Sequence, residues 1–195
     1  MLKFGKKVNY RPMILSILVA LTIGLLFGLN ISRQLGWALG IIMFLVMFVG
    51  HYLIVLPIIF SYWDSVDETI HYSDINQLYK RLFSMFLPKF SPIRTVTKNQ
   101  IKRINITGLP QCDTSLASDL VVSEEGGFMY NLLLMINDPV IVKLTTKNNQ
   151  VISLNLSHDY VDHPVQTLGK LRIFLHEFKP SIINLSEATK DVLKY

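Results

Sequence analysis

Two long apolar stretches dominate the first third of the chain. Asp, Glu, Lys and Arg are absent over 12–32 and again over 34–63. At a rise of about 1.5 Å per residue, each stretch is long enough to cross a hydrocarbon layer of about 30 Å as a helix. The pattern therefore predicts two membrane-spanning helices, over about 12–32 and about 37–57, with Pro57 ending the regular part of the second.

Four glycines occupy mirrored positions about the short turn between these stretches. Gly24 and Gly28 form a GxxxG motif in the first stretch, and Gly36 and Gly40 form another in the second. Such pairs of small residues let helix backbones approach closely. In an antiparallel hairpin the spacing predicts that Gly24 faces Gly40 and that Gly28 faces Gly36. Pairing between protomers and chance occurrence are the two alternatives.

Beyond the second apolar stretch the pattern changes to short strands and amphipathic helices. An amphipathic helix is predicted over 75–87, with Asp74 as its N-cap and Pro88 as its end. A closing helix with an apolar face that includes Val165, Leu168, Leu171, Leu175 and Phe178 is predicted over 164–178, and a last helix over 186–193. Strands are predicted over 69–72, 93–97, 101–107, 120–122, 140–146 and 151–157, the last two joined as a hairpin.

This order of elements predicts two parts. The first is a membrane helical hairpin over 1–63, and the second is an α+β cytosolic domain over 64–195. Several strands followed by one long amphipathic helix indicate an antiparallel sheet or partial barrel that the C-terminal helix caps.

The segment 92–104 reads Pro-Ile-Arg-Thr-Val-Thr-Lys-Asn-Gln-Ile-Lys-Arg-Ile, and a strand hairpin over 140–157 precedes the predicted closing helix. Together with the two spans, these segments resemble bacterial membrane proteins that carry a pleckstrin-homology-like (PH-like) domain. The size and arrangement are also similar to the EbsA-like family of enterococci and lactobacilli. The resemblance implies a PH-like sheet with a capping helix, and it carries over no catalytic residue.

Composition and charge agree with a membrane protein and give it an orientation. Half of the 195 residues are apolar and only 17% are charged. The turn between the apolar stretches holds only Arg33, whereas basic residues flank the other end of the hairpin: Lys3, Lys6, Lys7, Arg11, Lys80 and Arg81. Since cytoplasmic flanks carry the excess of Lys and Arg, we expect a multi-pass protein of the cell membrane with both termini in the cytoplasm. The single cysteine, Cys112, excludes an internal disulfide and fits a reducing compartment.

A basic tract lies between Asp74 and Asp113, where the chain has no acidic residue. Beside a membrane, each such charge can contribute about 1 kcal/mol of attraction to anionic lipid. The candidate contacts to lipid headgroups or to a protein partner are Lys80, Arg81, Leu82, Phe83, Lys89, Arg94, Lys98, Lys102 and Arg103. The alternative is a positively charged flank with a helix packed on its own domain. Nucleic acid is not an expected partner, because no recognition motif is present.

Two other segments contain ionisable side chains that could bind a ligand or transfer protons. His158, Asp159, Asp162 and His163 lie close together before a proline, and we interpret them as a solvated loop in which Asp162 helps to cap the next helix. A ligand site is the alternative. His51 lies inside the second apolar stretch, where a hydrogen bond to the partner helix is expected and a proton path is the alternative. No catalytic, cofactor or metal site is predicted.

The leading hypothesis is therefore a non-enzymatic integral membrane protein that presents a cytosolic PH-like domain to inner-leaflet lipid or to a protein partner. A subunit of an oligomeric pore or transport assembly is the first alternative, because two spans per chain need assembly to enclose a path. A membrane-tethered hydrolase that uses the histidines at 158 and 163 is the second.

Overall fold

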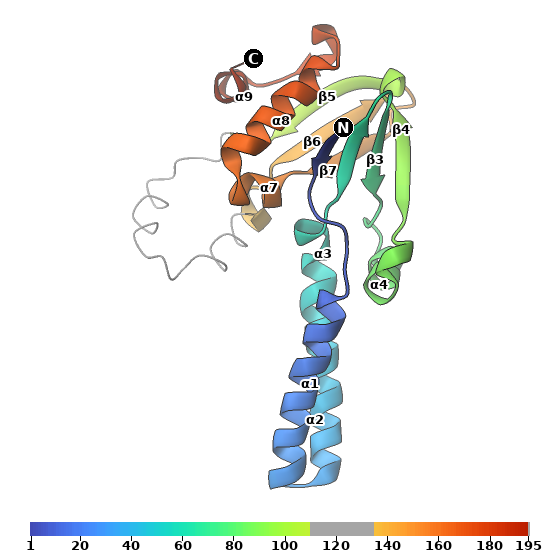
Figure 1. Ribbon diagram of the computed structural model, residues 1–195, viewed down its shortest axis with the longest axis vertical. Helices are drawn as coiled ribbons and strands as arrows, with labels where there is room; N and C mark the ends of the chain where they lie inside the picture. The colour runs from blue at the N-terminus through green and yellow to red at the C-terminus, as the bar shows by residue number, and fades with distance from the viewer. Residues whose placement is uncertain (110–134, 195) are drawn as a thin grey trace, which may run out of the picture. The chain divides into compact units, whose positions relative to one another are not determined.

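The computed structural model describes residues 1–109 and 135–194, which divide into two compact units (Figure 1). The hairpin unit comprises Lys7–Phe60 and Ser73–Ile93, and the sheet unit comprises Met1–Lys6, Ser61–Tyr72 and Arg94–Tyr195. This division by packing differs from the expected boundary at residue 63. The first six residues belong with the sheets, and the amphipathic segment belongs with the hairpin.

Two helical runs form the hairpin unit's long axis. The first is α1 (Arg11–Asn30), and the second runs through α2 (Arg33–Leu45), the π-helical η1 (Val46–Tyr52) and α3 (Leu53–Ile59). Both runs are long and apolar enough to cross a membrane, and only 11% and 22% of their most apolar windows are buried. Such exposure is not typical of the core helices of a soluble protein.

The four glycines lie where α1 and α2 approach each other most closely. A Cβ built on Gly36 would lie 2.5 Å from both the Gly24 carbonyl oxygen and the Gly28 Cα, and one on Gly40 would lie 3.5 Å from the Gly24 Cα. These distances are those of a hairpin closed on itself. Ser32 caps α2, because its hydroxyl accepts a hydrogen bond from the Leu35 N–H.

The amphipathic segment forms α4 (Leu78–Phe86) and the 3-10 turn η2 (Pro88–Phe90). The predicted N-cap was wrong: Gln77 occupies the N-cap position of α4 without a side-chain capping bond, and Asp74 instead binds Lys80 through its side chain. Met85 is fully buried and Ile75 nearly so, in a cluster with Phe48 and Leu56 of the second helical run. The sequence left open where this helix packs, and the apolar cluster places it in the hairpin unit.

The sheet unit contains two sheets among the described residues, each with four strands. The first has the order β1 (Leu2–Phe4), β2 (Trp63–Val66), β3 (Thr69–Ser73), β4 (Ile93–Thr97). The second has the order β7 (Val151–Asn155), β6 (Ile141–Thr146), β5 (Ile101–Thr107), β8 (Ile183–Asn184). The short 3-10 turns η3 (Lys98–Gln100) and η4 (Pro180–Ile182) precede β5 and β8. Pairing is antiparallel between β1 and β2, β2 and β3, β5 and β6, and β6 and β7, whereas β5 and β8 are parallel.

The predicted strands near 69, 93 and 101 and the hairpin of β6 and β7 are confirmed. The strand predicted over 120–122 lies outside the described residues, as does Cys112. Strands β1, β2 and β8 were not predicted. β1 has only three residues, too few for an alternating pattern to stand out, and β2 buries the adjacent polar residues Asp64 and Ser65, which breaks the usual alternation of apolar and polar positions.

The sheet unit also contains the helices α7 (Ser157–Asp162), α8 (Pro164–His176) and α9 (Glu187–Leu193). The Trp63 ring stacks on Phe4 with centroids 4.0 Å apart and meets the Phe174 ring of α8 edge-on at 5.1 Å. Leu171 and Leu175 of α8 are buried in the same core, but Val165 is 81% exposed and does not belong to the predicted apolar face. The expected α+β class, with antiparallel sheets covered by a C-terminal helix, is confirmed (Figure 1).

Candidate functional site

The histidine and aspartate cluster after β7 is a short helix, α7, and not the expected solvated loop. Its carboxylates bind the end of β1: the Gly5 N–H donates to Asp159 Oδ2 at 2.7 Å, and Lys6 Nζ lies 3.7 Å from Asp162 Oδ2. His158 lies between them, with Nε2 3.3 Å from Lys6 Nζ and Nδ1 3.2 Å from Asp162 Oδ2. Asp162 is thus engaged with side chains, and α8 has no side-chain cap. Within the described ranges, no group of three metal-ligating side chains occurs. The cluster holds the first strand in place.

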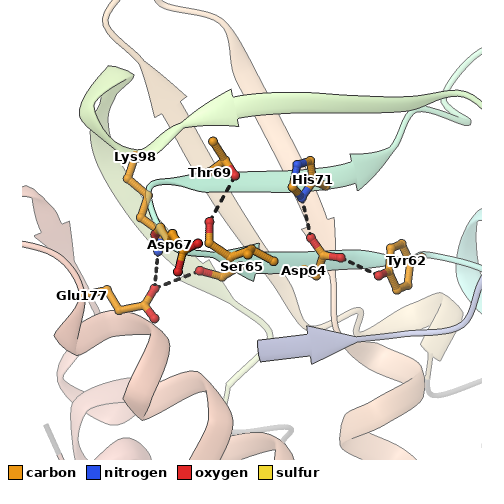
Figure 2. A network of polar contacts seen from close by, with 9 residues as sticks. Tyr62, Asp64, Ser65, Asp67, Thr69, His71, Lys98 and Glu177 are labelled. Atoms are coloured by element: carbon orange, nitrogen blue, oxygen red, sulfur yellow. Dashed lines mark hydrogen bonds and ion pairs between the residues drawn. The ribbon is translucent and has the colours of Figure 1, made fainter. Parts of the chain in front are cut away.

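A second polar network runs along β2 and β3 (Figure 2). Tyr62 Oη donates to Asp64 Oδ2 at 2.5 Å, and Asp64 Oδ1 lies 2.8 Å from His71 Nδ1, in the cross-strand position that the register gives. Ser65 donates to Glu177 Oε2 at 2.9 Å. Adjacent side chains of a strand point to opposite faces of the sheet. Ser65 therefore faces away from the pair of Asp64 and His71, and the three do not form a nucleophile, base and orienting acid.

Tyr62 should reveal this network in an alkaline titration. Burial first, and then the hydrogen bond to Asp64 and its negative charge, raise the pKa of Tyr62 to about 12. An unfolded tyrosine ionises near 10. The stabilisation is therefore complete below about pH 10 and is lost as the pH rises toward 12. Ultraviolet difference titration of the full chain should show a late tyrosine ionisation near pH 12 that is missing in Tyr62→Phe. Identical titration curves for the two proteins would contradict the buried pair.

The predicted basic contacts fall into two groups. Lys80 and Lys98 are engaged within the protein: Lys80 Nζ lies 2.5 Å from Asp74 Oδ2, and Lys98 Nζ lies 2.8 Å from Glu177 Oε2 and donates to the Asp67 carbonyl (Figure 2). Their side chains are only 14% and 10% exposed, so neither is available as a surface charge. The exposed basic candidates are Lys89, Arg94, Lys102 and Arg103.

Arg81 has a structural role that follows from Pro57. Proline has no N–H, so the carbonyl four residues earlier in a helix, that of Leu53, loses its usual donor. Arg81 Nη1 donates to the Leu53 carbonyl at 3.3 Å, while Nε donates to Ile75 at 2.9 Å and Nη2 to Asn76 at 3.3 Å. The guanidinium thus replaces the missing donor, which lets the helix continue past Pro57 to Ile59. The expected helix end at Pro57 was wrong for this reason.

The solvent-exposed side of α4 and η2 is apolar, as is the side that packs against the hairpin unit. Leu82 is partly buried against the core of the hairpin unit, whereas Phe83 is 46% exposed. We call the exposed set the α4 apolar face; its members are Leu78, Tyr79, Phe83, Phe86, Leu87 and Phe90. Contiguous exposed apolar groups of this kind mark contacts with a membrane or a protein. The two residues that the sequence singled out on this helix therefore separate, with Leu82 packing inward and Phe83 facing outward.

Two hydroxyl groups of α1 bond to the backbone of their own helix. The Ser16 hydroxyl donates to the Pro12 carbonyl at 2.7 Å, and the Thr22 hydroxyl donates to the Leu18 carbonyl at 2.9 Å. His51 is exposed, and its ring lies edge-on to that of Tyr52 with centroids 5.0 Å apart. These hydroxyls supply no polar row that could line a water-filled path.

Comparisons with protein-family models, with curated proteins and with solved structures found no match for this chain.

Proposed function

We propose that this chain is a non-enzymatic, two-span protein of the cell membrane that holds a PH-like sheet unit at the cytosolic surface. The hairpin crosses the bilayer, and the α4 apolar face lies in the interface beside it. The sheet unit is then available to inner-leaflet lipid or to a protein partner. One observation carries the proposal: the exposed apolar face belongs to the same compact unit as the two apolar helices.

The physical reason lies in where apolar surface can be exposed. A helix with apolar residues on its outer side and basic residues nearby is stable in the headgroup region, with its side chains buried about 5–10 Å deep. Tyr79, Phe83 and Phe86 provide the apolar groups, and Lys89 follows them on η2. In water the same face would favour aggregation, whereas in the interface it stabilises the bound position.

The PH-like character is supported by two features of the sheet unit. Its strands form antiparallel sheets, and α8 packs its buried Leu171 and Phe174 into their common core. The sheet unit also carries exposed basic residues for an anionic or acidic contact, among them Lys102 and Arg103 on β5. Hydrolysis is less well supported, because the ionisable clusters described above bind other parts of the fold.

Cysteine mapping in cells tests this proposal. In a background with Cys112→Ser, we expect Ser32→Cys to react with an impermeant maleimide in intact cells. Lys190→Cys, on α9, should react only after permeabilisation. Phe83→Cys should react slowly even then, because an interfacial thiol is shielded from the aqueous reagent.

The three positions separate the parts of the proposal. Labelling of Lys190→Cys in intact cells would overturn the orientation. Labelling of Phe83→Cys as fast as that of Lys190→Cys would remove the interfacial helix but leave the anchor. Rapid labelling of Phe83→Cys after denaturation is the control that the thiol itself is reactive.

A further inference from the structure

A cavity of about 300 Å³ lies within the hairpin unit, beside η2. Its polar lining comes from three separate stretches of the chain: Lys7, Asn9, Tyr10, Ser73, Lys89 and Ser91. Val8, Pro88 and Ile93 form its apolar wall. Among the described residues that line the cavity there is no carboxylate, so its charged groups are two lysines. The cavity is therefore electropositive and rich in hydrogen-bond donors.

The cavity lies at the end of the hairpin opposite the turn. Lys7, Asn9 and Tyr10 directly precede α1, whose first residue is Arg11. The Asn9 Oδ1 accepts the Arg11 N–H at 3.1 Å, which leaves the amide NH₂ of Asn9 as a donor. The start of a long helix also carries a partial positive charge. The turn at Ser32 and this cavity are thus separated by the full length of the two helices.

The groups around the cavity match the oxygens of a phosphate. Ammonium, hydroxyl and amide donors bind phosphate oxygens through short, charge-assisted hydrogen bonds. The volume is at the small end of the range for ligand sites, which suits a phosphate with its glycerol but not acyl chains. Beside the cavity, Phe90 is 70% exposed and Ile93 is 48% exposed, so apolar groups adjoin the polar ones. A free phosphate would gain nothing from these apolar neighbours, whereas a lipid would.

From this geometry we infer that the cavity binds the phosphate headgroup of an anionic phospholipid of the inner leaflet. Lys7 and Lys89 hold the phosphate charge, and the acyl chains continue past Ile93 along the apolar surface of the hairpin unit. The inference rests on the proposed function, because the headgroup reaches the cavity only if the hairpin spans the membrane. Binding in this cavity would select lipids with an anionic headgroup, beyond the general attraction of basic residues to an anionic membrane surface.

Native mass spectrometry of the full chain tests this site. The protein is released from nanodiscs that contain equal amounts of phosphatidylglycerol and phosphatidylcholine. We expect one retained phosphatidylglycerol per chain, with retention reduced roughly fivefold by Lys89→Gln and roughly 25-fold by Lys7→Gln with Lys89→Gln, since each charge near lipid contributes about a fivefold preference. Lys190→Gln is the matched control, because it removes the same charge from the exposed face of α9.

The outcomes separate the site from the anchor. Equal retention of phosphatidylglycerol by the double variant and by the Lys190→Gln control would overturn the site. Competition by millimolar glycerol phosphate with no preference between the two lipids would also overturn it, in favour of a soluble phosphate. Extraction of the wild-type chain from membranes by alkaline carbonate would instead contradict the proposed membrane anchor. A chain that resists extraction but retains neither lipid leaves the anchor intact and rejects only the site.

Discussion

A single methyl group added at Gly36 is expected to disrupt the helical hairpin, whereas the same group at Gly28 is expected to be tolerated. At Gly36 the new Cβ would lie 2.5 Å from the backbone of α1 at two places, and a backbone cannot move aside as a flexible side chain does. At Gly28 the nearest atom would be the Gly36 Cα at 3.6 Å, which is an ordinary contact. We expect Gly36→Ala to lower the free energy of unfolding of the hairpin by about 3 kcal/mol.

Unfolding of the full chain by sodium dodecyl sulfate in mixed micelles, followed by circular dichroism, measures this difference. Gly28→Ala should remain within about 1 kcal/mol of the wild type, and so should Gly50→Ala, since no atom lies within 4 Å of its Cβ. Equal stability of Gly36→Ala and Gly28→Ala would show that the close approach is absent. Loss of an oligomer with unchanged monomer stability would instead assign the glycines to assembly and favour the pore alternative.

Replacing Arg81 by Met is expected to have the second large effect. The change preserves the length of the side chain but removes the donors to the carbonyls of Leu53, Ile75 and Asn76. A buried carbonyl that loses its partner costs about 1–3 kcal/mol; the bonds to Leu53 and Ile75 are partly buried and carry most of this cost, whereas the bond to Asn76 is exposed. We therefore expect a loss of about 3 kcal/mol and early proteolytic cleavage between α3 and α4, both measured on the full chain in detergent.

Pro57→Ala provides the control for the mechanism. Alanine restores the N–H that can bond to the Leu53 carbonyl, so in the Arg81→Met background it should recover about 1 kcal/mol. In the wild-type background the same change should have a smaller effect, because the carbonyl already has Arg81 as its donor. A double-mutant cycle measures this coupling. A coupling of zero would mean that Arg81 stabilises α4 without compensating for the proline.

Features that repeat locally in the sequence could be predicted. The two apolar helices and the hairpin of β6 and β7 each rest on a continuous pattern of residues, and the structure has them. Strands β1 and β2 could not be found in this way, because their partners lie far along the chain. Phe4 stacks on Trp63 and Trp63 meets Phe174, and only this tertiary packing makes strands of segments with weak local preference.

The partners of the charged residues could not be predicted from the sequence either. A run of basic residues looks uniform in the sequence, but Lys80 and Lys98 are bound by Asp74 and Glu177, and Arg81 binds backbone carbonyls. No sequence pattern gives these partners, because Glu177 lies far from Lys98 along the chain. The missing donor at Pro57 was the one signal that predicts a compensating side chain, although not which one.

The placement of β1 has a consequence for synthesis of the protein. The first residues of the chain leave the ribosome before α1, yet Gly5 binds Asp159, 154 residues later. At about 5–20 residues per second, translation of that length takes roughly 8–30 seconds. Leu2–Phe4 can pair with β2 (Trp63–Val66) early in that interval, but Gly5 has no Asp159 to bind until its end. The sheet unit is therefore completed only after both helices of the hairpin unit have been synthesised, and in the membrane protein proposed above its last contacts form once the hairpin is available for insertion.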